Sequence, residues 1–100
     1  MVNQGIINLF PHIRNFFATQ PVQKAWLFGS CSRGEETSES DIDILVSYIP
    51  DSRISLMSIS RMICNLSKIA GRKVDIVEEG QLQPFARPSA LHDRILIYER

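Results

Sequence analysis

The chain has 100 residues, which is enough for one small domain and too few for two that fold independently. Eleven basic and eleven acidic residues give a formal net charge of zero. This balance argues against a protein that coats nucleic acid through many phosphate contacts, but it leaves room for a small nucleotide ligand.

Residues 3–18 are predicted to form an amphipathic helix, because apolar side chains recur there at spacings of four, three and four residues. Pro11 lies inside this segment and lacks a backbone donor, so the helix should kink or restart there. The pair Gln20-Pro21 ends the segment. The apolar positions are Ile6, Phe10, Ile13 and Phe17.

Two strands with a polar connection are predicted next. Residues 24–28, KAWLF, are a short apolar run that meets Gly29-Ser30, which indicates a buried strand and a tight turn. Residues 31–40 are small, polar and charged, and they suit a short helical turn and a loop. Residues 41–48 alternate in character, as in a strand with two different faces. One face carries Ile42, Ile44 and Val46, and the other carries Asp41, Asp43 and Leu45.

The second half of the chain predicts a helix, a strand and a mixed tail. Residues 53–70 have an apolar stripe, with Asp51 or Ser52 as the N-cap and Gly71 just past the end. Residues 73–77, KVDIV, indicate a third strand. A short helical stretch near 88–93 and a final strand over 95–99 follow. The stripe of the helix consists of Leu56, Ile59, Ile63, Leu66 and Ala70.

This order of elements favours an α/β (α+β) fold, with helices flanking a small mixed β-sheet in a single domain over residues 1–100. Cys31 and Cys64 lie far apart without a histidine at zinc-ligand spacing, so neither a zinc site nor a disulfide framework is expected. No signal peptide and no membrane-spanning run is expected either, so we predict a cytoplasmic protein.

Asp41 and Asp43 are two residues apart on a predicted strand, so their carboxylates should stand side by side. Such a pair repels itself and is costly to bury without a cation. Mg²⁺ resolves this repulsion, because it prefers oxygen ligands and binds one or two carboxylates together with substrate phosphates. The alternative is a strand whose polar face is simply hydrated, since short acidic motifs have low specificity.

Asp75 is a third acidic residue on an otherwise apolar strand. If this strand lies beside that of Asp41 and Asp43, three carboxylates converge on one patch, as a one- or two-metal phosphoryl-transfer site requires. The alternative role for Asp75 is a salt bridge to Lys73 or Arg72.

A phosphate-binding turn is predicted at Gly29-Ser30, because glycine lets a phosphate approach the backbone and Ser30 offers a hydroxyl. An ordinary turn is the alternative. Arg33 is suited either to hold a phosphate or pair with the aspartates, or to bridge the glutamates that follow it. Ser40 is suited to order the loop before Asp41 by bonding nearby backbone.

The segment FGSCSRGEETSESDIDILV resembles the signature of the polymerase-beta-like nucleotidyltransferase superfamily, which is Gly-Ser, ten residues and Asp-x-Asp. Gly29-Ser30 and Asp41-x-Asp43 match it with the spacing intact. Arg33-Gly34 and the Ser40 that precedes the acidic pair also resemble the smallest branch, the minimal nucleotidyltransferases (MNT). Asp75 in KVDIV matches the third carboxylate of that family by position and strand context.

The resemblance implies the nucleotidyltransferase fold and transfer of a nucleoside monophosphate, AMP from ATP or its equivalent from another triphosphate, to an acceptor hydroxyl. It implies that Asp41 and Asp43 bind the Mg²⁺ that grips the triphosphate. They would share a second Mg²⁺ with Asp75, which helps to deprotonate the acceptor. The implied nucleotide-binding residues are Gly29, Ser30, Arg33 and Ser40.

Minimal members of the superfamily often act beside a HEPN protein, as the antitoxin of a toxin–antitoxin pair. The resemblance therefore implies a HEPN-type protein partner, in a homo- or hetero-oligomer. Two functions stay open: a Mg²⁺-dependent transferase that modifies its partner, and a non-catalytic binding antitoxin with a vestigial nucleotide site. A transferase acting on RNA is disfavoured by the neutral charge.

Overall fold

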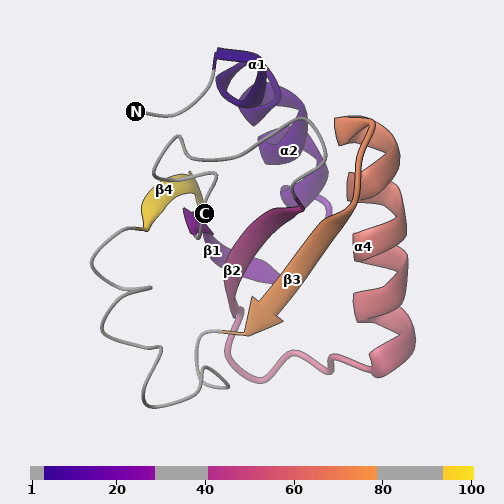
Figure 1. The fold of residues 1–100 in the computed structure, drawn as a ribbon. Helices are drawn as coiled ribbons and strands as arrows, with labels where there is room; N and C mark the ends of the chain where they lie inside the picture. The colour runs from indigo at the N-terminus through magenta and orange to yellow at the C-terminus, as the bar shows by residue number, and fades with distance from the viewer. Residues whose placement is uncertain (1–3, 29–40, 79–93) are drawn as a thin grey trace, which may run out of the picture.

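The computed structural model describes residues 4–28, 41–78 and 94–100, which build a four-stranded sheet with the order β3-β2-β1-β4 (Figure 1). The central pair is β1 (Val22–Phe28) and β2 (Ile42–Tyr48), which run antiparallel. The edges are β3 (Val74–Glu78), parallel to β2, and β4 (Ile95–Glu99), antiparallel to β1. The predicted mixed sheet is therefore confirmed.

The N-terminal helix restarts, as its proline predicts. A short first helix, α1 (Gln4–Ile7), is followed by α2 (Phe10–Phe17). Pro11 lies in the first turn of α2, where a helix has no partner for the backbone N–H that proline lacks. Two turns of the predicted stripe, Ile13 and Phe17, are fully buried against the sheet.

The third described helix, α4 (Leu56–Ala70), starts later than predicted. Its N-cap is Ser55, whose hydroxyl accepts a hydrogen bond from the Ser58 N–H, so the expectation of Asp51 or Ser52 is wrong. The chain turns at Asp51, which adopts a left-handed backbone (φ 66°), and the next residues remain non-helical until Ser55. The predicted helix over residues 53–70 is therefore too long at its N-terminal end, because the residues after the turn are not helical.

The buried face of α4 also differs in part from the predicted stripe. Leu66 is fully buried and Ile59 packs against the core, but Leu56 is 83% exposed because it occupies the first position of the helix. Met62 is buried in its stead. At the other end, Gly71 closes the helix with a left-handed backbone (φ 72°), as predicted.

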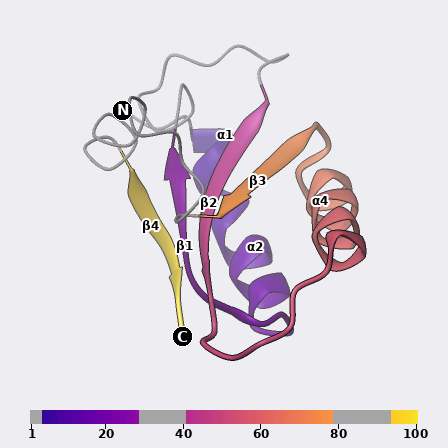
Figure 2. The same ribbon diagram turned by 90° about the horizontal axis from the view of Figure 1, so that it is seen from below.

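All described helices cover the same face of the sheet (Figure 2). The core lies between them, and alternate residues of each strand point into it. The opposite face carries the other alternate residues, including a buried pair across β1 and β2, Trp26 and Leu45. The Arg94 guanidinium lies 4.3 Å from the centre of the Trp26 ring. Among the described helices, none is long and apolar enough to cross a membrane. The core consists of Ile6, Ile13, Phe17, Val22, Ala25, Leu27, Ile42, Ile44, Val46, Met62, Leu66, Val74 and Ile97.

Candidate active site

Sheet pairing brings together the ends of three strands that sequence analysis linked to chemistry. Asp43 on β2 pairs with Asp75 on β3 in the parallel register. On its other side, Asp43 pairs with Phe28, the last residue of β1 and the residue before Gly29. The predicted convergence of Asp43 and Asp75 on neighbouring strands is therefore present.

The carboxylates lie on the sheet face that the helices leave uncovered. Ile42 and Ile44 point into the helix-side core, so Asp43 between them must point to the opposite face. Val74 is also buried in that core, which turns Asp75 the same way. Both carboxylates are only partly buried, as a site that admits a ligand requires.

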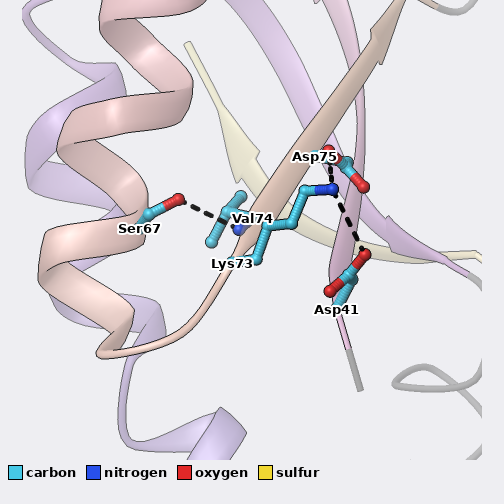
Figure 3. Close-up of polar contacts among 5 residues, drawn as sticks. All are labelled: Asp41, Ser67, Lys73, Val74 and Asp75. Atoms are coloured by element: carbon cyan, nitrogen blue, oxygen red, sulfur yellow. Dashed lines mark hydrogen bonds and ion pairs between the residues drawn. The ribbon is translucent and has the colours of Figure 1, made fainter. Parts of the chain in front are cut away.

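Lys73 links Asp75 to Asp41 through a shared positive charge (Figure 3). The Lys73 Nζ lies 3.8 Å from Asp41 Oδ2 and 3.9 Å from Asp75 Oδ1. The salt bridge that sequence analysis offered as the alternative role for Asp75 therefore forms, and it extends to a second carboxylate. Asp41 and Asp75, which lie far apart in the sequence, thus face one ammonium group.

The environment of Asp43 disfavours the charged form of its carboxyl group. Partial burial is the largest cause that raises the pKa of its carboxyl above the ordinary value of 3.8. The negative charges of Asp75 and Asp41 raise this pKa further, and the positive charge of Lys73 opposes them. The three carboxylates therefore act on one another electrostatically, and an added cation would relieve the repulsion.

Two hydrogen bonds hold the backbone at Lys73 and Val74 between β2 and α4. The Ile42 N–H donates to the Lys73 carbonyl over 3.0 Å, which extends the pairing of β2 and β3 by one position. The next residue, Val74, donates its N–H to the Ser67 hydroxyl on α4, also over 3.0 Å (Figure 3). Ser67 carries no recognisable signal in the sequence, because a serine in the last turn of a helix resembles any polar surface position.

The donor chemistry of the cluster suits a hard divalent cation that arrives with a nucleotide. Within the described ranges, no three His, Cys, Asp or Glu side chains lie close enough to hold a metal ion as a set. Mg²⁺ does not need three, because it often takes one or two protein carboxylates and completes its shell with phosphates and water. The oxygens of Asp41 and Asp75 already face a common cationic nitrogen. The carboxylates present thus fit Mg²⁺ as partial ligands.

The predicted nucleotide-binding residues fall within residues 29–40, outside the part of the chain that the structure describes. They remain predictions from sequence. What the structure adds is the strand that precedes them, which ends opposite Asp43. These residues are Gly29, Ser30, Arg33 and Ser40.

Comparison with known proteins gives a consistent family. A model of the nucleotidyltransferase domain matches residues 11–97. The chain is 38% identical over 77 residues to a proposed protein adenylyltransferase of Methanocaldococcus jannaschii, a match covering 76% of this chain and 77% of the relative. The solved structure of a proposed minimal nucleotidyltransferase superposes with a TM-score of 0.78 at 28% identity, covering 95% of each chain.

Two solved complexes share the fold at lower identity. A toxin–antitoxin complex with AMP-PNP contains a chain that matches with a TM-score of 0.67 at 21% identity, covering 97% of this chain and 73% of that one. A complex of a tri-AMPylated Shewanella oneidensis HEPN toxin with its MNT antitoxin matches with a TM-score of 0.62 at 16% identity, covering 91% and 73%. With the family model spanning most of the sequence, the chain belongs to the nucleotidyltransferase domain family and is an enzyme of the nucleotidyl-transferring class.

Proposed function

We propose that this protein transfers AMP from ATP to a hydroxyl group on a partner protein, with Mg²⁺ as cofactor, as the antitoxin of a HEPN/MNT pair. The pairing of Asp43 with Asp75 across two strands is the observation that carries the proposal. Two like charges side by side do not stabilise a sheet, so a role in binding a cation is the better explanation. The name of the Methanocaldococcus relative and the AMPylated toxin complex support the reaction and the partner class.

Each carboxylate has a defined task in this reaction. Asp41 and Asp43 would hold the Mg²⁺ that binds the triphosphate, and they would share a second Mg²⁺ with Asp75. When bound, the metal would neutralise phosphate charge. Asp75 accepts the proton of the acceptor hydroxyl. The hydroxyl oxygen then forms a bond to the α-phosphorus while the bond to pyrophosphate breaks in line with it.

The nucleotide is held, in this proposal, by the segment that follows β1. Gly29 and Ser30 come directly after Phe28, which pairs with Asp43, so a phosphate bound there would lie near the carboxylates. Ser30 would supply a hydroxyl and Arg33 a positive charge to the triphosphate. Ser40 would order the approach to Asp41.

A second candidate function is a binding antitoxin that neutralises its toxin by contact alone. The ion pairs of Lys73 favour it, because an ammonium group already compensates Asp41 and Asp75 without metal. Such charge compensation would suit a protein that keeps the nucleotidyltransferase fold but no longer binds metal or transfers nucleotides.

The test is label transfer from ATP carrying a labelled α-phosphate, with Mg²⁺, into a lysate of the source cell. Wild type should label a protein band, and Asp43→Asn should abolish the label. Asp51→Asn is the matched control, because Asp51 is exposed in a turn and asparagine tolerates its left-handed backbone. Equal labelling by Asp43→Asn would overturn the proposal. Toxin neutralisation that survives Asp43→Asn undiminished would favour the binding antitoxin.

A further inference from the structure

Lys73 occupies the position between two of the three acids. Its ammonium lies at similar distances, 3.8 and 3.9 Å, from one oxygen of Asp41 and one oxygen of Asp75 (Figure 3). Both contacts are ion pairs at the outer limit of direct contact, so neither acid dominates. A single charge thus offsets repulsion between carboxylates that the strand pairing forces together.

The backbone at Lys73 is held by hydrogen bonds, whereas its side-chain ammonium can move into solvent. The Lys73 carbonyl accepts from the Ile42 N–H, and the adjoining Val74 N–H is held by Ser67 on α4. In contrast, the Lys73 side chain is 65% exposed and ends in a strongly hydrated ammonium on a flexible stem. Exposed ion pairs of this kind are weak, so little free energy is lost when the ammonium moves into water.

We propose that Lys73 is a built-in counter-cation, which holds Asp41 and Asp75 together in the metal-free protein and competes with the divalent cation for them. The competition follows from charge, because a dication bound to the same two oxygens repels an ammonium held between them. Metal binding therefore displaces the ammonium. The affinity of the site for the metal is lowered by the free energy of the two ion pairs that are broken. This inference rests on the metal-dependent function proposed above.

Lys73 then affects which form of the divalent cation the site takes up. Before nucleotide arrives, the Lys73 ammonium offsets part of the negative charge that Asp41, Asp43 and Asp75 carry together. The metal-free site is then less repulsive and binds a free divalent cation less tightly. A cation that arrives with a triphosphate brings further ligands and outcompetes the lysine more easily.

The test measures metal affinity and thermal stability in the absence of nucleotide, using Mn²⁺ or Mg²⁺ titrated into purified full-length chain by calorimetry. Lys73→Met should tighten the dissociation constant about fivefold, in keeping with the modest strength of exposed ion pairs. In EDTA the same variant should unfold at a temperature lower by about 2–4 °C, because the acids lose their counter-charge. Lys73→Arg, which keeps the charge, should stay close to wild type in both measurements.

The matched control is Lys24→Met, which removes a lysine that pairs with Glu99 over 3.2 Å, on β1 and β4. It should leave metal affinity unchanged. Metal binding by wild type that is unchanged or weakened in Lys73→Met would overturn the inference and leave the proposed function standing. Absence of metal binding in every variant would instead remove the metal-dependent function, and the competition with it. Lys73→Gln repeats the test should Lys73→Met fail to fold.

Discussion

Asp43 and Asp75 are direct partners in the parallel pairing of β2 and β3, although the whole of α4 lies between them in the chain. The pairs on either side, Ile42 with Val74 and Ile44 with Ile76, place apolar side chains on the helix-side face. A slip of one residue would turn those side chains to the wrong face, so burial of the core fixes the register of the acids. The site is therefore a by-product of core packing.

Neutralising Asp43 should stabilise the metal-free protein at neutral pH. The pKa of this carboxyl is raised in the folded state, so folding favours its protonated form. That contribution is fully present below the unfolded pKa of 3.8 and is lost as pH rises through the folded pKa. Asp43→Asn should thus raise the unfolding temperature in EDTA at about pH 7, and its effect should shrink as pH falls below the raised pKa of the folded state. Thermal unfolding followed by circular dichroism measures both, with Asp51→Asn as control.

A lower unfolding temperature for Asp43→Asn at neutral pH would contradict this account. It would mean that the charged carboxylate makes interactions that outweigh its burial and its acidic neighbours.

Removing the Ser67 hydroxyl should loosen the start of β3. Ser67→Ala deprives the Val74 N–H of its acceptor, which should cost about 1 kcal/mol of the free energy of unfolding. Transfer of labelled AMP should fall as well, because Lys73 and Asp75 lose an anchor. Ser60→Ala, an exposed serine on the same helix, should change the free energy of unfolding by less than about 0.5 kcal/mol. Urea unfolding of both variants provides the comparison, and equal stability losses would refute the anchoring role.

Two leucines of α4 that share one sequence stripe should lose very different amounts of stability on the same substitution. Leu66 is fully buried, so Leu66→Ala should cost about 2–5 kcal/mol through lost burial and a cavity. Leu56 is 83% exposed, so Leu56→Ala should cost less than about 0.5 kcal/mol. Denaturant midpoints measure the difference. A large loss at Leu56 would show that this end of the helix is covered in solution.

The N-cap of α4 can be tested by exchanging the capping oxygen. Ser55→Ala should lower the free energy of unfolding by about 1 kcal/mol, because the Ser58 N–H loses its acceptor. Ser55→Asp should retain most of the stability, since aspartate also caps a helix. Chemical denaturation of the two variants decides the matter, and equal stability of Ser55→Ala and wild type would place the helix start elsewhere.

Sequence alone predicted the elements whose periodicity is set by burial. Three local features correspond to elements of the structure. They are the alternation around Asp43, the apolar context of Asp75 and the proline in the first helical segment. The mixed sheet followed from these patterns, and the family followed from the resemblance of the spaced motif to a known signature. Such features are local, so the chain displays them without tertiary information.

The contacts that organise the site were less visible, because they depend on tertiary register. Lys73 could be suggested as a partner of Asp75, since the two are near in sequence, but its contact with Asp41 requires β3 to lie beside β2. The exposure of Leu56 likewise depends on where the turn at Asp51 lets α4 begin. Helical spacing does not contain that information.

The order of the strands along the chain has a consequence for a chain that is cut between β3 and β4. Among the described elements, Asp43 on β2 comes before α4, Asp75 on β3 comes after it, and β4, which covers the outer edge of β1, follows β3. A nascent or clipped chain that lacks Ile95–Glu99 would carry all three acids and yet leave the backbone of β1 unpaired on one side. An unpaired strand edge can pair with other chains and aggregate, so the pairing of β4 with β1, which includes Ala25 with Tyr98, protects this edge from association.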